Sequence, residues 1–94
     1  MPINIYNYES SESIDYLCEG EWYLPMQIPV LEKWLKTKGV LLPKSSYVAD
    51  IGFDICKDAC GGGAVLSAVS MKIMGDIGMD IFLSEYPESE EFDE

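Results

Sequence analysis

"YVADIGFDIC", residues 47–56, decides the fold, because its side chains alternate between two faces. One face carries Ala49, Ile51, Phe53 and Ile55, and the other carries Val48, Asp50, Gly52, Asp54 and Cys56. A strand with one apolar and one wetter side is typical of a sheet that helices cover on a single face. The stretch therefore predicts a protein in which strands and helices are packed in two layers.

The sequence after residue 56 continues this pattern with a helix and a further strand. We expect the helix to follow Gly61–Gly63 and to end at Gly75 or Gly78. Its inward residues are predicted to be Val65, Leu66, Val69, Ile73 and Met74. Residues 79–84 then alternate, with Met79, Ile81 and Leu83 opposed to Asp80, Phe82 and Ser84. This order fits a β-α-β crossover, although one intervening strand would also fit.

The first half of the chain predicts a hairpin followed by a helix. Residues 3–9 and 13–19 alternate, the second with Ile14, Tyr16 and Cys18 on one face, and "SSES" joins them. Pro29 suits the first helical turn, and Val30, Leu31, Trp34 and Leu35 then repeat at helical spacing, with Trp34 in the core. Gly39 is expected to take a left-handed cap.

Together these elements predict one small α+β domain over residues 1–86. Its sheet is expected to be antiparallel or mixed, with three to five strands, two helices packed on one face and a C-terminal β-α-β segment. Residues 87–94, "PESEEFDE", are predicted to form a flexible acidic tail. Tyr86 and Phe92, set among glutamates, are interpreted as part of a disordered segment that could fold against a basic groove.

Charge limits the choice of partners. Six basic residues oppose 17 acidic residues, giving −11, and all six are lysines because the chain has neither arginine nor histidine. Arginine supplies the paired donors that phosphates and guanine edges require. We therefore expect no nucleic acid and no membrane as a partner, and a basic protein instead. Acidity that serves only solubility is the alternative, and the oligomeric state is left open.

The stretch "DICKDACGGGAVLS", residues 54–67, is the first candidate for chemistry, whereas Asp50, Asp54 and Asp80, which together could bind a divalent cation, are interpreted as a solvated acidic face of the sheet. Cys56, Cys60 and the distant Cys18 do not complete the four donors of a structural zinc site, so we expect no metal and no cofactor. The glycines lack the spacing of a phosphate-binding loop, and Asp58 would oppose a phosphate. Without histidine, a cysteine–histidine nucleophile is impossible. The chain is accordingly predicted not to be an enzyme.

The first ten residues and the cysteine count predict a cytoplasmic location. The first ten residues contain neither a basic segment nor a long apolar run, so they do not resemble a signal peptide. Three cysteines, an odd number, are expected to be reduced thiols.

The acidic and aromatic side chains supply the predicted partner-binding residues. These are Glu12, Asp15, Glu19, Glu21, Trp22, Tyr23, Asp50, Asp54 and Asp80. In size and charge the chain is similar to bacterial immunity proteins that neutralise nuclease toxins, which implies an inhibitor that covers a cationic active-site surface. It also resembles acidic phage proteins that mimic nucleic acid. A small enzyme or ligand-binding domain using residues 56–63, with Lys57 or Cys60, is the remaining alternative.

Overall fold

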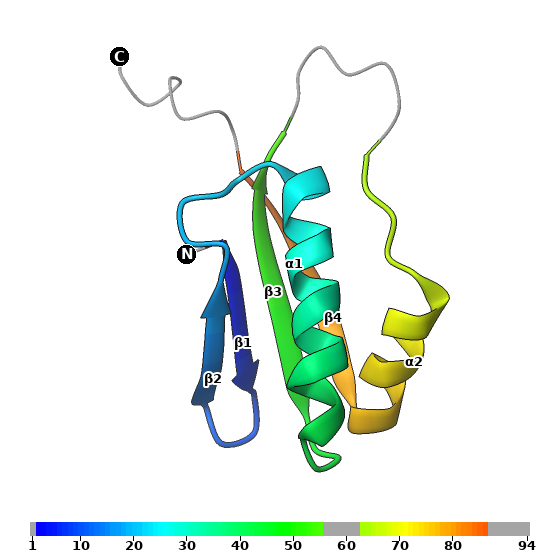
Figure 1. The fold of residues 1–94 in the computed structure, drawn as a ribbon. Coiled ribbons are helices and arrows are strands. Elements are labelled where there is room, and N and C mark those ends of the chain that lie inside the picture. The colour runs from blue at the N-terminus through cyan, green and yellow to red at the C-terminus, as the bar shows by residue number, and fades with distance from the viewer. Residues whose placement is uncertain (1, 56–62, 87–94) are drawn as a thin grey trace.

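A computed structural model describes residues 2–55 and 63–86, and it has strands and helices in the predicted order. The elements are β1 (Ile3–Asn7), β2 (Glu12–Leu17), α1 (Leu24–Thr37), the 3-10 helix η1 (Gly39–Leu41), β3 (Tyr47–Asp54), α2 (Ala68–Ile77) and β4 (Met79–Tyr86). Both α-helices supply side chains to one core on one face of the sheet (Figure 1). The predicted α+β class is confirmed. The expected tail 87–94 lies outside the described residues.

The sheet is mixed, with the strand order β2-β1-β3-β4. β1 is antiparallel to both β2 and β3, whereas β3 and β4 are parallel and are joined through α2. The predicted C-terminal β-α-β segment is therefore confirmed. The alternation predicted for residues 47–54 is also confirmed, since Ala49 and Ile51 are buried on the helix side and Asp54 is exposed.

The hairpin formed by β1 and β2 contains a bulge that changes the predicted faces. Ser13 lies opposite Tyr6 and Asp15 lies opposite Ile5, so Ile14 is an additional residue in β2. Ile14 packs against the core, whereas Tyr16 lies on the far side of the sheet opposite Asn4. The prediction that Ile14 and Tyr16 share a face was therefore wrong, because a bulge shifts the alternation by one residue.

Helix α1 begins five residues before the predicted start at Pro29. Pro25 occupies its first turn, and Pro29 lies inside the helix. The early start is anchored by the buried Gln27, whose side-chain amide donates to the carbonyls of Glu21 (2.6 Å) and Gly52 (2.8 Å). These tertiary bonds fix the first turn, and the sequence pattern does not contain them.

Gly39 does not adopt the predicted left-handed cap. The chain continues from α1 into η1, and Gly39 is the first residue of η1. A Cβ at this position would lie 3.1 Å from Leu35 Cδ2 and 3.2 Å from Trp34 Cζ3. Close packing against α1, rather than backbone handedness, therefore favours a glycine here.

Helix α2 confirms part of the predicted apolar face, since Met74 is buried and Leu66 and Ile73 pack against the core. Ser67 caps its first turn by accepting from the Ser70 backbone N–H (3.2 Å), so the helix starts at Ala68. Its buried residues are Ser70, Met74 and Ile77. Val65 precedes the helix and is 81% exposed, and Val69 is also exposed, so the inward placement of these two valines was wrong. Gly78, not Gly75, ends the helix in the left-handed conformation.

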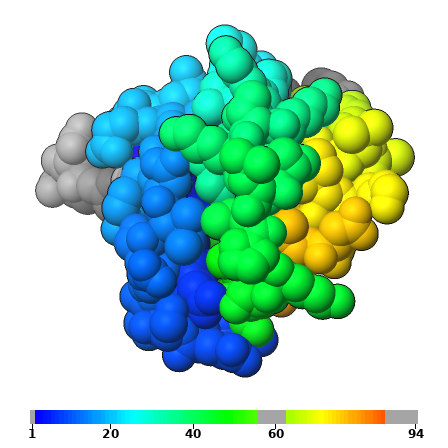
Figure 2. All heavy atoms as spheres, turned by 60° about the horizontal axis from the view of Figure 1, so that its bottom comes forward, coloured from blue at the N-terminus to red at the C-terminus, as the bar shows by residue number. Residues whose placement is uncertain are grey.

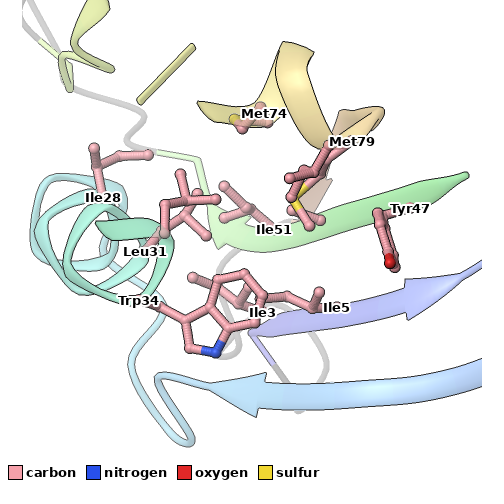
Figure 3. Packing of buried hydrophobic residues seen from close by; sticks show 12 residues of the cluster. Ile3, Ile5, Ile28, Leu31, Trp34, Tyr47, Ile51, Met74 and Met79 are labelled. Carbon is pink, nitrogen blue, oxygen red and sulfur yellow. The ribbon is translucent and has the colours of Figure 1, made fainter. Parts of the chain in front are cut away.

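The hydrophobic core lies between the helices and one face of the sheet (Figure 3). Ile3, Ile5 and Ile51 from the strands and Leu31 and Leu35 from α1 are fully buried. Each such side chain contributes about 1.5–3 kcal/mol when it leaves water. Trp34 packs in this core, as predicted, and its indole nitrogen faces β2 (Figure 3).

The outline of the molecule follows this layering. In Figure 2 the β1–β2 hairpin, in blue, and α2, in yellow, lie on opposite sides of the segment around residues 38–50, in green. None of the described helices has the length and the apolar character to cross a membrane.

Candidate functional site

The strands carry a second face that none of the described helices covers. Alternation and register place one set of side chains there, and we call this surface the open face. It comprises Asn4, Tyr6, Tyr16, Val48, Asp50, Gly52, Asp54, Asp80, Phe82, Ser84 and Tyr86. The opposite residues of the same strands, such as Ile5 and Ala49, are fully buried beneath the helices. The open face is therefore the broad side of the sheet that faces water.

Three of the predicted carboxylates come together on the open face. β3 and β4 are neighbours, with Val48 opposite Asp80, Asp50 opposite Phe82 and Asp54 opposite Tyr86. The Ser84 hydroxyl donates to Asp50 Oδ1 at 2.6 Å, which holds that carboxylate in place. Asp54 and Asp80 are exposed. The sheet thus presents one oriented and two solvated negative charges on a single surface.

Aromatic side chains lie among these carboxylates. The rings of Trp22 and Tyr86 meet edge to face, with centroids 5.4 Å apart and planes at 90°. They lie over Gly52, where a Cβ would come within 2.9 Å of the Tyr86 ring and 3.2 Å of the Trp22 ring. The Asp54 backbone N–H donates to the Trp22 carbonyl (2.9 Å), so main-chain bonding also fixes Trp22 beside β3. A glycine in β3 therefore makes room for an aromatic pair on the open face.

A hollow of about 300 Å³ opens at the hairpin end of the same surface. We call it the tyrosine hollow, and it is lined by Asn4, Tyr6, Tyr8, Ser11, Ser13 and Tyr16. Tyr8 and Tyr16 are exposed, and Asn4 Oδ1 is buried with no hydrogen-bond partner within the described part of the chain. The lining contains aromatic rings, hydroxyl groups and an amide, and no ionisable carboxylate or lysine.

Asp15, by contrast, lies on the helix side of the sheet. Its Oδ2 accepts a hydrogen bond from the Trp34 indole N–H at 2.8 Å and lies 3.7 Å from Lys38 Nζ. Asp15 pairs with Ile5 in the register, and Ile5 is buried. This carboxylate therefore ties β2 to α1, and the structure does not bring it together with Asp50, Asp54 and Asp80.

The other predicted residues lie at the edge of the open face or away from it. Glu12 is exposed on β2 opposite Asn7, which is on the helix side. Glu19, Glu21 and Tyr23 belong to the connection between β2 and α1. Glu21 Oε2 accepts from the Tyr23 backbone N–H (3.2 Å), and Tyr23 is the residue before α1.

Several aromatic residues of this surface were not among the predicted site residues. They are Tyr6, Tyr8, Tyr16, Phe82 and Tyr86. Tyr86 was assigned to a disordered segment, but it is the last residue of β4. A signal was present for Tyr6, because it alternates with Ile3 and Ile5 in β1. Tyr16 could not be found this way, since the bulge in β2 reverses its face.

The lysines of the described residues lie with the helices, whereas the strands carry carboxylates only. The strands carry Glu12, Asp15, Asp50, Asp54, Asp80 and Glu85, and they carry no lysine. The lysines of the described residues are Lys33, Lys36, Lys38, Lys44 and Lys72, on or next to the helices and before β3. Of the strand carboxylates, only Asp50, Asp54 and Asp80 lie on the open face, which therefore carries three carboxylates and no lysine.

The metal-ligating and nucleophilic groups of the described residues include carboxylates and the Cys18 thiol. Within residues 2–55 and 63–86, no group of three or more carboxylates and cysteines is arranged to hold a metal ion. Burial raises the pKa of the Cys18 thiol, and the Glu21 carboxylate adds to the effect, so this thiol stays protonated at neutral pH. Cys56, Lys57 and Cys60, the residues of the enzyme alternative, lie outside the described residues.

Comparison with protein-family models, with curated proteins and with solved structures finds no match to this chain.

Proposed function

We propose that this protein is a stoichiometric inhibitor of the immunity type, which covers the basic active-site surface of a nuclease-like toxin with its open face. The single observation that carries the proposal is the open face itself, an uncovered sheet surface with aromatic side chains and carboxylates but no lysine. The proposed setting is the bacterial cytoplasm, where reduced cysteines are the ordinary state.

Charge complementarity supports a basic partner. A surface that binds nucleic acid carries clustered lysine and arginine, and the carboxylates Asp50, Asp54 and Asp80 match such a cluster. Opposite fields accelerate encounter and disfavour wrong partners, whereas their contribution to final affinity is smaller. The net charge of −11 adds a long-range attraction toward any strongly basic protein.

The aromatic residues support tight contact after encounter. Phe82, Tyr16 and Tyr86 are exposed on the open face, and aromatic side chains often dominate interface energy because they bury a large area with few rotatable bonds. Trp22 and Tyr86 hold each other in place over Gly52, so little conformational freedom is lost on binding. Carboxylates for steering and rigid aromatics for contact together suit an inhibitor.

The open face does not suit dimerisation with a second copy of this chain. Two open faces in contact would place Asp50, Asp54 and Asp80 of one copy against the same carboxylates of the other, without lysines from the strands to separate them. Like charges at close range oppose association. We therefore assign the open face to a basic protein rather than to a dimer.

The test begins by identifying the partner and then measures it as a purified protein. The immobilised chain captures proteins from its native lysate at about 50 mM and about 500 mM NaCl, between which the screening length falls roughly threefold. We expect one strongly basic protein, encoded next to this chain, whose capture weakens as salt rises. In the purified pair we expect 1:1 binding and loss of the partner's nuclease activity.

Two pairs of matched variants locate the binding surface. Asp80→Asn on the open face and Asp76→Asn on α2 change the net charge equally, and we expect only the first to slow association, by about two- to fivefold at low salt. Phe82→Ala and Met71→Ala remove side chains that are 55% and 54% exposed, and only the first should speed dissociation, by about tenfold or more. Equal effects within both pairs, or binding unaffected by salt, would refute the proposal.

A further inference from the structure

The tyrosine hollow is chemically distinct from the rest of the open face. Its lining is uncharged, whereas the surface beside it carries Asp50, which lies opposite Asn4 in the register. Tyr6, Tyr8 and Tyr16 contribute three rings from two strands and the hairpin turn, and Ser11 and Ser13 contribute hydroxyl groups. A hollow of about 300 Å³ with such walls is large enough for one long side chain rather than for a chain segment.

Asn4 supplies an independent indication that a donor is missing. Its Oδ1 is buried, yet no group within the described residues donates a hydrogen bond to it. A buried amide oxygen without a donor is destabilising, and most such atoms in native proteins are paired. A ligand that brings N–H groups into the hollow, after a small rotation of the amide, would satisfy this atom.

We propose that the tyrosine hollow receives the guanidinium group of one arginine side chain from the partner, a statement that rests on the proposed function. A flat guanidinium stacks on tyrosine rings, and its five N–H donors suit the amide oxygen of Asn4 and the serine hydroxyls. The negative charge of the molecule attracts the cation, and Asp50 lies opposite Asn4 on the same face of the sheet. A lysine ammonium fits less well, because it is a strongly hydrated point charge without a flat face.

The experiment uses N-acetyl-arginine amide as the probe and the isotope-labelled full chain as the receptor. Chemical shifts are followed during titration, in parallel with N-acetyl-citrulline amide, which has nearly the same shape without the charge, and with N-acetyl-lysine amide. We expect shifts concentrated at Asn4, Ser11, Ser13 and the tyrosine rings of the hollow, with the arginine derivative binding more tightly than either of the others.

A matched pair of tyrosine variants tests the walls of the hollow. Tyr16→Leu should weaken arginine binding about two- to fivefold, the amount expected for one exposed ring. Tyr23→Leu should leave it unchanged, although Tyr23 is as exposed as Tyr16 (59% against 53%). Tyr8→Leu, outside the strands, repeats the test without altering the sheet.

The possible outcomes separate this inference from the proposed function. Equal binding of citrulline or lysine, or shifts confined to Asp54 and Asp80, would overturn the role of the hollow. Those results would leave intact the salt-sensitive capture of a basic protein and its dependence on Phe82. Conversely, if binding of the basic protein does not depend on Phe82, the proposed function is refuted, whether or not N-acetyl-arginine amide binds in the hollow.

Discussion

Removing the Asp15 carboxylate should destabilise the fold, although Asp15 was first interpreted as a partner-binding residue. Trp34 is only 5% exposed, and its indole N–H has the Asp15 carboxylate as acceptor at 2.8 Å. In Asp15→Ala this buried donor loses its acceptor. Hydrogen bonds to charged groups are worth about 1.5–3 kcal/mol. Because the Asp15 side chain is 33% exposed, we expect the lower part of that range, about 1.5–2 kcal/mol.

The ion pair with Lys38 is the smaller of the two interactions. Lys38 Nζ lies 3.7 Å from Asp15 Oδ2, and the Lys38 side chain is 69% exposed. Exposed pairs contribute about 0–1 kcal/mol because water and salt screen them. Lys38→Met should therefore cost less than about 0.5 kcal/mol. Asp15→Asn, which keeps an oxygen acceptor for the indole, should fall between the two variants.

Urea unfolding followed by far-UV circular dichroism measures these differences. With a slope of about 1–3 kcal/mol per molar urea, Asp15→Ala should lower the midpoint by about 1 M. Glu12→Ala, an exposed carboxylate on the same strand, is the control and should change the midpoint little. If Lys38→Met destabilises as much as Asp15→Ala, the charge and not the indole bond holds β2 to α1. If Asp15→Ala matches Glu12→Ala, the reasoning fails.

Three further predictions concern the contacts that position the helices. Gly78→Ala should destabilise the fold by more than about 2 kcal/mol in urea unfolding, because φ at Gly78 is +82° and the new Cβ would collide with the Ser45 carbonyl. Gly20 has the same φ but open space around it, so Gly20→Ala should cost about 1 kcal/mol. Gln27→Met removes both amide bonds to backbone carbonyls and should lower the free energy of unfolding by about 2 kcal/mol. Glu32→Gln should lower the free energy of unfolding at neutral pH by less than about 1 kcal/mol. In urea titrations at decreasing pH, the variant and the natural protein should become equally stable as the pH falls through the lowered pKa of Glu32.

The sign of the Glu32 effect follows from the groups around it. The backbone N–H of Ser67 donates to Glu32 Oε2 at 2.7 Å, and the Ser70 hydroxyl donates to the same oxygen at 2.9 Å. These hydrogen bonds lower the pKa of Glu32, and the bond from the Ser67 backbone N–H has the largest effect. A carboxyl with a lower pKa in the folded state stabilises above its unfolded pKa and loses that stabilisation as the pH falls. A difference that grows toward acid would contradict the assignment.

The strand pattern in the sequence was sufficient to predict the sheet but not the details of its faces. Alternation in residues 47–54 and 79–84 correctly placed Asp50, Asp54 and Asp80 on one face of the sheet. The same rule failed in β2, because the bulge at Ile14 adds a residue without any local signal. Patterns of period two locate faces only where the register is unbroken.

The helix boundaries depended on contacts between distant residues. Pro25 and Pro29 both suit a first helical turn. The helix starts near Pro25 because the Gln27 side chain donates to carbonyls of the β2–α1 connection and of β3. Likewise, Glu32 of α1 binds Ser67 and Ser70 and sets the start of α2. Apart from the Gln27–Glu21 bond, which spans six residues, these partners are 25 to 38 residues apart, so local propensity could not reveal them.

The same distinction explains which predicted site residues share a surface. Composition marks every carboxylate alike, yet folding divides them. Asp15 and Glu32 accept hydrogen bonds that join the helices to the strands or to each other, whereas Asp54 and Asp80 remain solvated on the open face. The lysines within residues 2–55 and 63–86 lie on or next to the helices or before β3, away from the open face. The basic partner that we propose would be steered toward the open face, because there no lysine offsets the carboxylates.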